Sequence, residues 1–415
     1  MTTGKTDNKS IALPASWDLR SLGEVVKPTR PRIKPSEKPD LPFIGMENIE
    51  AHTMKLLGTV SAGTMKSSAV HFQPDDVLYG RLRPYLNKVY RPDFEGLCSA
   101  EFIVFPKAEC ISSRYLQYFL NSSSFVSYTS HLNAGDRPRV DFEQLSPYPF
   151  PVAPYEQQEC IVAEIEKQFS RLDEAVATLK RVKANLKRYK AAVLKAAVEG
   201  KLASTDPGNW TRTNLGTVVT AIEAGKSFKC EERFPNSREV GVVKVSAVTW
   251  GIFDEEESKT CLDPARVEPR YFIQAGDFLF SRANTIELVG ACVIAQKVTR
   301  KLMLSDKILR FRFSNLVLPQ WVLCWLRSDI GRKEIRRLST GNQESMRNIG
   351  QDRILQIVFA LPSLDEQRAI VAEVERRLSV IEELQAAVDA NLTRADRLRQ
   401  AVLNKAFVGA LITSL

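Results

Sequence analysis

One long stretch occurs twice in this chain of 415 residues, and that repeat limits the possible folds more than any other feature. The sequence IVAEIE at 161–166 returns as IVAEVE at 370–375, a shift of 209 residues. Further matches at the same shift lie near the end of each copy: 192–194 with 401–403, Gly200 with Gly409, and Leu202 with Leu411. Agreement at one fixed shift indicates an internal duplication.

Each copy predicts one long helix of about 65 Å. Neither copy contains a proline or glycine between residues 155 and 199 or between 364 and 408. An apolar residue recurs at every seventh position: Ile165, Leu172, Leu179, Leu186 and Val193, then Val374, Ile381, Val388, Ala395 and Val402. A second slot, three residues further on, holds Ala175, Val182, Tyr189 and Ala196, with Leu384 and Leu398 in the other copy.

This period of 3.5 residues is typical of a coiled coil, whose apolar seam must face another helix. The other copy is the nearest candidate for that partner, and the two helices would run either parallel or antiparallel. A helix lying on the surface of its own domain is the alternative.

The duplication extends beyond the helices, with a shift that changes as loops are inserted. The sequence DVLYGR at 76–81 matches DFLFSR at 277–282, and Trp17 matches Trp210. We therefore expect a globular domain at 13–153, a helix at 154–202, a second globular domain at 203–362 and a helix at 363–412. Short apolar runs at 102–105, 240–245, 278–280 and 291–295 predict strands, and 113–121 and 319–338 predict amphipathic helices.

Composition places the chain among proteins of the reducing cytoplasm. Its seven cysteines are scattered without a C-x-x-C pair, which argues against zinc and against a disulfide framework. No long apolar run predicts a membrane span, and the polar residues 1–10 predict no signal peptide. The net charge is +9, and residues 180–195 hold seven basic and no acidic residues, which fits a nucleic-acid partner.

Motifs of catalytic chemistry are missing from the sequence. Gly225, Lys226 and Ser227 resemble the end of a phosphate-binding loop, but Thr220 stands where that loop requires glycine. No dinucleotide, zinc-protease or serine-hydrolase motif occurs, and His52, His71 and His131 are too scattered to predict a metal centre. We expect no catalysis by this chain alone.

Three segments carry a family resemblance, and they are 276–282 (GDFLFSR), 361–367 (LPSLDEQ) and 400–411 (QAVLNKAFVGAL). Together with the doubled layout over residues 13–412, they resemble the specificity subunits of type I restriction–modification systems. The first domain departs from the pattern, because 78–84 reads LYGRLRP where the commoner loop has Ser-Arg. This departure affects which residues of the first domain would contact bases more than it affects the role that the resemblance implies for the chain.

The resemblance implies an α+β fold with two similar α/β target recognition domains, separated by two long helices that form an antiparallel coiled coil. Each domain would read half of a split, asymmetric sequence in double-stranded DNA, and the helices would dock two methyltransferase subunits. S-adenosylmethionine, ATP and Mg would be bound by those partners and by a restriction/translocase subunit, and no cofactor by this chain.

Loops that directly follow strands, and the loops that match them later in each domain, supply the candidate DNA contacts. Arg suits guanine, and Asn or Gln suits adenine. These residues are Arg81, Arg83, Arg137 and Arg139 in the first domain and Arg282, Asn284, Gln343, Ser345 and Arg347 in the second. An exposed charge or a loop-capping bond is the alternative for each single residue.

Matched apolar residues near the helix ends are the candidates for partner binding. They are Val193, Leu194, Val198 and Leu202 in the first helix and Val402, Leu403, Phe407 and Leu411 in the second. A place in the buried seam is the alternative for all of them.

Two other functions fit the same pattern. The chain could be the recognition subunit of a related type II or other DNA-modifying defence system. It could also be a coiled-coil scaffold whose domains bind proteins, in which case duplex binding with a steep salt dependence would be missing.

Overall fold

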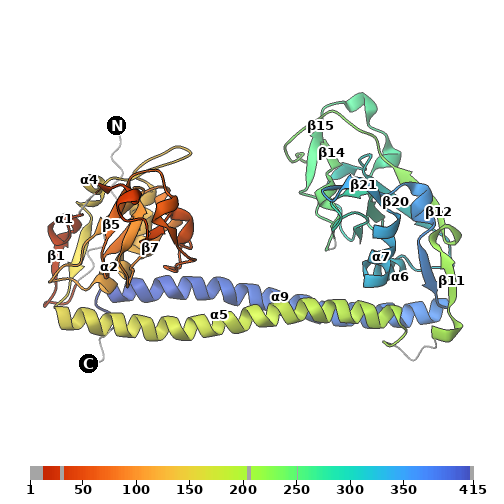
Figure 1. The fold of residues 1–415 in the computed structure, drawn as a ribbon. Coiled ribbons are helices and arrows are strands. Elements are labelled where there is room, and N and C mark those ends of the chain that lie inside the picture. Colours follow the sequence, from red (N-terminus) through yellow and green to blue (C-terminus); the bar gives the residue numbers. More distant parts are fainter. Residues whose placement is uncertain (1–12, 29–31, 203–206, 250, 412–415) are drawn as a thin grey trace. The chain divides into compact units, whose positions relative to one another are not determined.

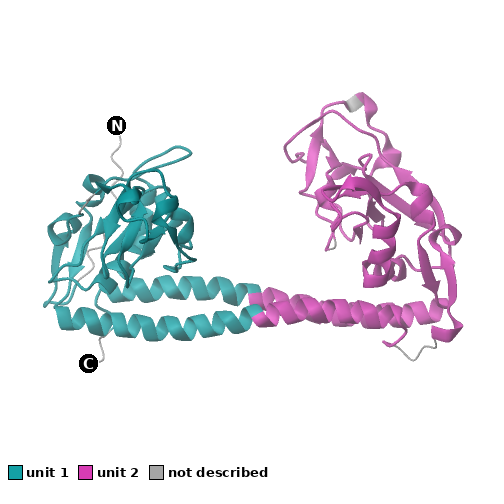
Figure 2. Ribbon diagram, viewed as in Figure 1, with its two compact units in different colours: residues 1–180, 389–415 teal, residues 181–388 magenta. Residues whose placement is uncertain are grey.

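The structure, a computed structural model, describes residues 13–28, 32–202, 207–249 and 251–411. Two compact units divide the chain: unit 1 comprises residues 1–180 and 389–415, and unit 2 comprises residues 181–388 (Figure 2). Both boundaries fall inside long helices, α5 (Tyr155–Val198) and α9 (Leu364–Phe407), each of 44 residues. Each unit therefore holds one globular domain and part of each helix.

Within each unit α5 and α9 lie side by side and antiparallel. In unit 1 the beginning of α5 packs against the end of α9: Arg399 pairs with Asp173 and lies 4.2 Å from the ring centre of Phe169. In unit 2 the end of α5 meets the beginning of α9, where Lys190 lies 3.7 Å from Glu382. The antiparallel coiled coil and the α+β class are therefore confirmed (Figure 1).

The two heptad slots differ in burial. In the first slot Ile165, Val193, Val374 and Ile381 are at most 1% exposed. The second slot faces solvent instead: Val182, Tyr189, Leu384 and Leu398 are between 38% and 49% exposed. Where only two helices pack together, each helix buries its first heptad slot against the other. The second slot stays exposed because a third helix would be needed to cover it.

Unit 1 is built on two sheets and a pair of strands. Its sheets have the orders β2-β5-β8-β3-β4 and β7-β6-β9, and β1 pairs with β10. The strands are β1 Asp18–Ser21, β2 Arg32–Ile33, β3 Pro42–Ile44, β4 Val60–Ser61, β5 Ala69–Phe72, β6 Val77–Gly80, β7 Val89–Tyr90, β8 Gly96–Ser99, β9 Phe102–Phe105 and β10 Pro149–Val152. The helices before α5 are α1 Leu22–Val25, α2 Ser113–Leu120, α3 Ser123–Ser130 and α4 Phe142–Leu145.

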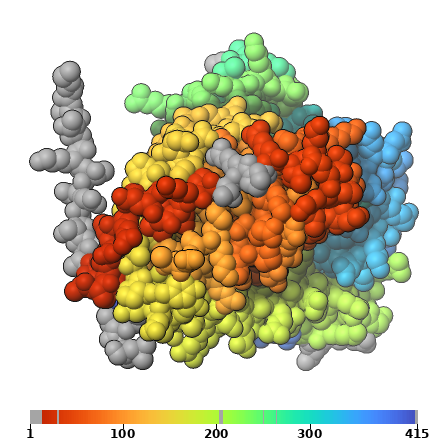
Figure 3. Space-filling model, turned by 60° about the vertical axis from the view of Figure 1, so that its left-hand side comes forward, coloured from red at the N-terminus to blue at the C-terminus, as the bar shows by residue number. Residues whose placement is uncertain are grey.

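The main core of unit 1 is shared between the globular domain and both long helices. Trp17 and Tyr115 belong to the same buried cluster as Phe169 of α5 and Phe407 of α9. The Phe407 ring centre lies 5.1 Å from that of Tyr115 and 5.2 Å from that of Phe119. Figure 3 shows the outside of this packing, where the red and orange residues meet the yellow-green start of α5.

Unit 2 repeats the plan with more strands. Its sheets have the orders β12-β20-β16-β18, β13-β15-β14-β19 and β17-β22-β21, and β11 pairs with β23. The strands are β11 Thr211–Asn214, β12 Val219–Ala224, β13 Cys230–Glu231, β14 Val240–Val243, β15 Ser258–Cys261, β16 Phe278–Ser281, β17 Ala283–Asn284, β18 Cys292–Ile294, β19 Lys301–Met303, β20 Ile308–Phe313, β21 Thr340–Gln343, β22 Met346–Asn348 and β23 Val358–Leu361.

Two helices, α6 (Pro319–Arg327) and α7 (Asp329–Leu338), lie between these strands and α9 (Figure 1), and α8 (Gln351–Leu355) precedes β23. The predicted helical region 319–338 is thus divided at Ser328. This serine has an extended backbone, and its hydroxyl accepts a hydrogen bond from the amide of Gly331. It therefore begins a new helix in the manner of an N-cap.

One buried glutamine near the start of each long helix ties that helix to its domain. In unit 1 Gln158 accepts from the amide of Ser112 (2.9 Å) and donates to the carbonyl of Ala153 (2.8 Å). In unit 2 Gln367 accepts from the amide of Leu318 (2.8 Å) and donates to the carbonyl of Pro362 (2.9 Å). These matched bonds fix each domain on its helix.

Candidate nucleic-acid interface

The two predicted DNA-contact loops of unit 1 lie against each other. Arg81 follows β6, and its carbonyl oxygen accepts a hydrogen bond from the amide of Val140 (3.1 Å). The amide of Arg83 donates to the carbonyl of Pro138 (2.8 Å), and Leu82 forms a β-bridge with Arg139. Residues far apart in the sequence thus form one surface.

The four arginines of this surface have different partners. Arg81 pairs with Asp141, and Arg139 lies 3.0 Å from Glu101. Arg139 donates hydrogen bonds to the carboxylate of Glu101, and these bonds raise the pKa of Arg139. Within the described part of the chain, Arg83 and Arg137 have no side-chain hydrogen bond or ion pair, and Nε of Arg83 is buried. These two guanidinium groups are available to a ligand.

Arg83 also has a strained backbone. Its φ of 52° lies in the left-handed region, which is costly for a residue with a side chain. The bond of its amide to Pro138 and the turn that begins at Pro84 hold it there. Strain of this kind is concentrated at ligand-binding sites in proteins.

The corresponding loops of unit 2 are joined more extensively, in the sheet β17-β22-β21. Ala283 pairs with Asn348, and Asn284 pairs with Arg347. Thr340 pairs with Asn348, and Gln343 pairs with Met346, so that β21 and β22 form a hairpin beside β17. The candidates of unit 2 therefore also share one surface.

The candidate side chains of unit 2 differ in how many hydrogen bonds they already form within the chain. Arg347 donates to the carbonyl oxygens of Ser339 (2.8 Å) and Gly341 (2.7 Å), so it braces the hairpin. Oδ1 of Asn284 accepts from the amide of Thr285 (2.8 Å). For Arg282 the described residues provide no side-chain hydrogen bond or ion pair, and its Nε is buried.

A cavity adjoining Arg282 contains residues that sequence analysis did not single out. Its volume is about 610 Å³, and besides Arg282 it is lined by Thr340, Asn348, Gly350, Asp352, Arg353 and Gln356. The only available signal for Asp352, Arg353 and Gln356 was their position just after the predicted loop at 341–347. Composition alone does not distinguish them from other exposed residues.

The residues predicted for partner binding are mostly core residues of the chain itself. Val193, Leu194 and Val198 are at most 7% exposed, and Leu403 and Phe407 are at most 8% exposed. Val402 and Leu411 pack against the core of unit 1, and Leu202 is half-buried. Their burial supports the alternative of a structural seam, and we therefore expect that replacing Leu403 and Phe407 by Asp would unfold the domain rather than affect partner binding alone.

The described residues offer neither a metal site nor a membrane-spanning helix. Across the residues that the structure describes, no group of three or more His, Cys, Asp or Glu side chains lies close enough to hold a metal ion. No described helix is both long and apolar enough to cross a membrane.

Comparison with known proteins agrees with this geometry. Residues 14–188 match the model of the type I restriction modification DNA specificity domain. The specificity subunit of the type I restriction enzyme EcoKI from Escherichia coli strain K12 is 28% identical over 72% of this chain and 66% of that subunit. The EcoEI specificity subunit of Escherichia coli is 23% identical over 96% of this chain and 84% of that subunit.

The first domain thus matches the DNA specificity domain of type I systems, and the chain is similar to type I specificity subunits over nearly its whole length. Solved structures share the fold of this chain. A chain from a study of complex assembly in a type I R-M system has a TM-score of 0.78 at 22% identity and covers 96% of this chain and 99% of its own length. The HsdS subunit from Thermoanaerobacter tengcongensis has a TM-score of 0.56 at 23% identity and covers 96% and 98%.

Proposed function

We propose that this chain recognises a bipartite, asymmetric sequence in double-stranded DNA, with one half read by each unit. The support is the same arrangement in both units: the loop after a central strand is joined to a later loop. In these loops the side chains of Arg83, Arg137 and Arg282 have no partner among the described residues. Guanidinium groups suit both the edge of guanine and backbone phosphate. The loops differ in residue type, so the two half-sites should be unrelated.

The chemistry would belong to partner subunits. In this proposal two methyltransferase subunits transfer the methyl group from S-adenosylmethionine, and a further subunit cleaves DNA with ATP and Mg. This chain would supply recognition and attachment, without a catalytic residue of its own.

The uncovered heptad slot is the docking surface we propose for the methyltransferases. Leu384 and Tyr189 lie on it in unit 2, and Leu398 lies on it in unit 1. In unit 1 the slot borders a groove of about 660 Å³ that is also lined by Leu172, Leu179 and other residues of both helices. Apolar heptad positions that two helices leave exposed suit a further amphipathic helix. One such surface per unit gives two docking sites.

Mapping methylated bases in the source genome, with and without this gene, tests the recognition role. We expect one bipartite motif to lose methylation when the gene is removed, with two unrelated halves. A palindromic motif would contradict the asymmetric assignment. Unchanged methylation, together with no salt-sensitive binding of duplex DNA, would favour the scaffold alternative.

Substitutions on the exposed slot test the docking role. We expect Leu384→Asp combined with Leu398→Asp to remove the methyltransferases in native mass measurements, while the chain stays folded because both side chains are exposed. Leu316→Asp, at a residue that is 55% exposed in unit 2 outside the long helices, is the matched control. Two methyltransferases still bound to the double variant would show that docking occurs elsewhere.

A further inference from the structure

The hairpin β21–β22 of unit 2 is held in one conformation at its base and at its turn. At the base Arg347 binds the carbonyl of Gly341, and at the turn the amide of Ile286 donates to the carbonyl of Glu344 (2.7 Å). Gly341 has a φ of 130°, and a Cβ there would lie 2.3 Å from the carbonyl oxygen of Met346. Only glycine fits this close contact. The hairpin therefore presents its side chains in fixed directions.

The side chains it presents are polar, with one large apolar exception. Every residue of β21 is exposed, and Met346, at the start of β22, is 74% exposed. Met346 lies opposite Gln343, whose amide oxygen accepts a long 3.5 Å bond from Ser345. Single exposed apolar residues are common on protein surfaces. Met346, however, lies on the hairpin beside the amide of Gln343, whose two donors have no partner among the described residues.

The cavity beside Arg282 opens at the base of the same hairpin, because the paired residues Thr340 and Asn348 form part of its wall. Arg282 and Arg353 supply two positive charges to the lining, and Asp352 supplies one negative charge. Arg353 uses one nitrogen to donate to the carbonyl of Leu338 (3.1 Å). A partly buried guanidinium group like that of Arg282, to which the described residues offer no partner, suits an anion from outside.

We propose that β21–β22 enters the major groove of the target duplex as a two-stranded ribbon, with Gln343 and Met346 at the base edges and a backbone phosphate held by Arg282. This inference rests on the proposed function and specifies how unit 2 reads its half-site. The major groove is about 12 Å wide and admits a two-stranded ribbon. The Gln amide matches N6 and N7 of adenine, and an apolar side chain contacts the 5-methyl group of thymine. The half-site read by unit 2 therefore contains an A·T pair.

Selection from a library of randomised duplexes tests the ribbon. The full chain, with the subunits that copurify with it, is used as wild type, Met346→Ala, Gln343→Ala and Arg282→Ala. We expect the wild type to select two sequence blocks. Met346→Ala and Gln343→Ala should relax the preference for A·T in one block and leave the other block unchanged. Arg282→Ala should weaken binding to all duplexes alike and reduce the salt slope by about 1.

Replacing thymine by deoxyuridine in the selected duplex isolates the methyl contact. For the wild type we expect binding about fourfold weaker, the effect of one buried methyl group. For Met346→Ala the two duplexes should bind equally. The control is Leu316→Ala, because Leu316 is also a large exposed apolar residue of unit 2 and lies outside the hairpin. This variant should select the same sequences as the wild type and keep its thymine preference.

The outcomes distinguish a failure of the proposed function from a failure of the ribbon proposal. If the wild type selects no bipartite sequence, the proposed function itself fails. If it selects one, but Met346→Ala and Gln343→Ala keep the preferences of both blocks, the ribbon is wrong and the proposed function stands. Because both side chains are exposed, we expect the variants to fold, and thermal melting checks this.

Discussion

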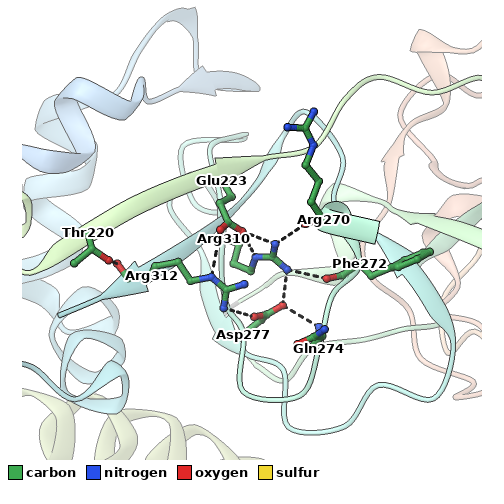
Figure 4. A network of polar contacts seen from close by, with 8 residues as sticks. All are labelled: Thr220, Glu223, Arg270, Phe272, Gln274, Asp277, Arg310 and Arg312. Carbon is green, nitrogen blue, oxygen red and sulfur yellow. Dashed lines mark hydrogen bonds and ion pairs between the residues drawn. The ribbon is translucent and has the colours of Figure 1, made fainter. Parts of the chain in front are cut away.

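Two buried aspartates occupy matching places in the two units and are stabilised in different ways. Asp76 of unit 1 accepts hydrogen bonds from the backbone amides of Gln73 (2.8 Å) and Lys107 (3.1 Å). Asp277 of unit 2 lies 2.9 Å from Arg310 and 3.0 Å from Arg312 (Figure 4). One aspartate thus relies mainly on the backbone, and the other also on two guanidinium groups.

Strand register shows where this difference arises. In unit 1 Leu78 of β6 pairs with Val104 of β9, and in unit 2 Leu279 of β16 pairs with Arg310 of β20. Val104 and Arg310 therefore hold the same place in the two sheets, and both are buried. The two units thus share this strand pairing, but unit 2 has a buried ionic network where unit 1 has an apolar side chain.

The largest expected effect is a loss of stability in unit 1 alone when its shared core is disrupted. Leu403→Asp combined with Phe407→Asp removes two large side chains from the core of unit 1 and buries two carboxylates. The cost should exceed about 5 kcal/mol, which is comparable to the whole stability of a domain. Segment-resolved hydrogen exchange should show loss of protection in unit 1 and its retention in most of unit 2. Equal protection of both units would contradict the shared core.

The next effect tests the ionic network of unit 2. Arg310→Val installs the residue type of unit 1 and leaves Asp277, whose side chain is 3% exposed, with Arg312 as its remaining ion-pair partner. Breaking a buried pair in this way costs about 3–5 kcal/mol. Urea unfolding followed by hydrogen exchange in β12, β16 and β20 measures it. The matched control is Val104→Leu in unit 1, a change of apolar shape that should leave unit 2 unaffected.

A third effect is the opposite response of the two units to acid. Burial raises the pKa of Asp76. Burial also opposes ionisation of Glu223, but its bonds to Arg310 and the charge of Arg312 outweigh this and lower its pKa. The stability that Glu223 contributes is present above its unfolded pKa of 4.5 and is lost as pH falls through the folded value. For Asp76 the contribution is largest below its unfolded pKa of 3.8 and declines as pH rises through the raised value.

Glu223→Gln and Asp76→Asn separate these two contributions. We expect the stability difference between wild type and Glu223→Gln to shrink on going from about pH 6 to about pH 3. The difference between wild type and Asp76→Asn should shift in favour of the wild type over the same range. Denaturant unfolding at each pH measures both, and parallel curves for the two variants would contradict the assignment.

The smallest effect concerns an exposed ion pair of unit 1. Glu101→Gln releases Arg139 and should change the stability of the domain little, because both side chains are partly solvated. The freed arginine should increase duplex affinity at low salt, since a carboxylate no longer competes for it. Binding measured across a salt series checks this, and a loss of affinity would show that the pair positions the loop.

Much of the fold could be predicted because apolar periodicity is a local signal. Ile165 and Val374 belong to the apolar residues that recur at every seventh position. This repeat predicts both long helices and the side on which they pack against each other. The exposure of Leu384 could not be predicted, because a heptad repeat does not determine how many helices pack together. With only two helices, part of the apolar stripe stays exposed. Gln158 and Gln367 are visible as a repeated pair at the shift of 209, but their bonds to loop backbones depend on tertiary structure.

The candidate site was predictable at the level of loops and less so at the level of side chains. Arg282 and Arg83 were nominated because each follows a strand, and the structure leaves both without a side-chain partner among the described residues. Arg347 is predicted because it lies in the later loop that matches the one in the first domain, yet it braces the hairpin. Arg310 was missed because an arginine within an apolar strand looks solvent-facing until Asp277 is brought beside it.

The shared core of unit 1 has a consequence for the order in which the chain folds during synthesis. Trp17 and Phe407 belong to one buried cluster, although about 390 residues separate them. At about 5–20 residues per second, the ribosome needs roughly 12–50 s to pass from the end of the first globular domain to Phe407. Unit 2, a continuous segment, is complete before then. The domain that is translated first is therefore completed last, and until then its apolar surface for α9 is exposed to chaperones and to neighbouring chains.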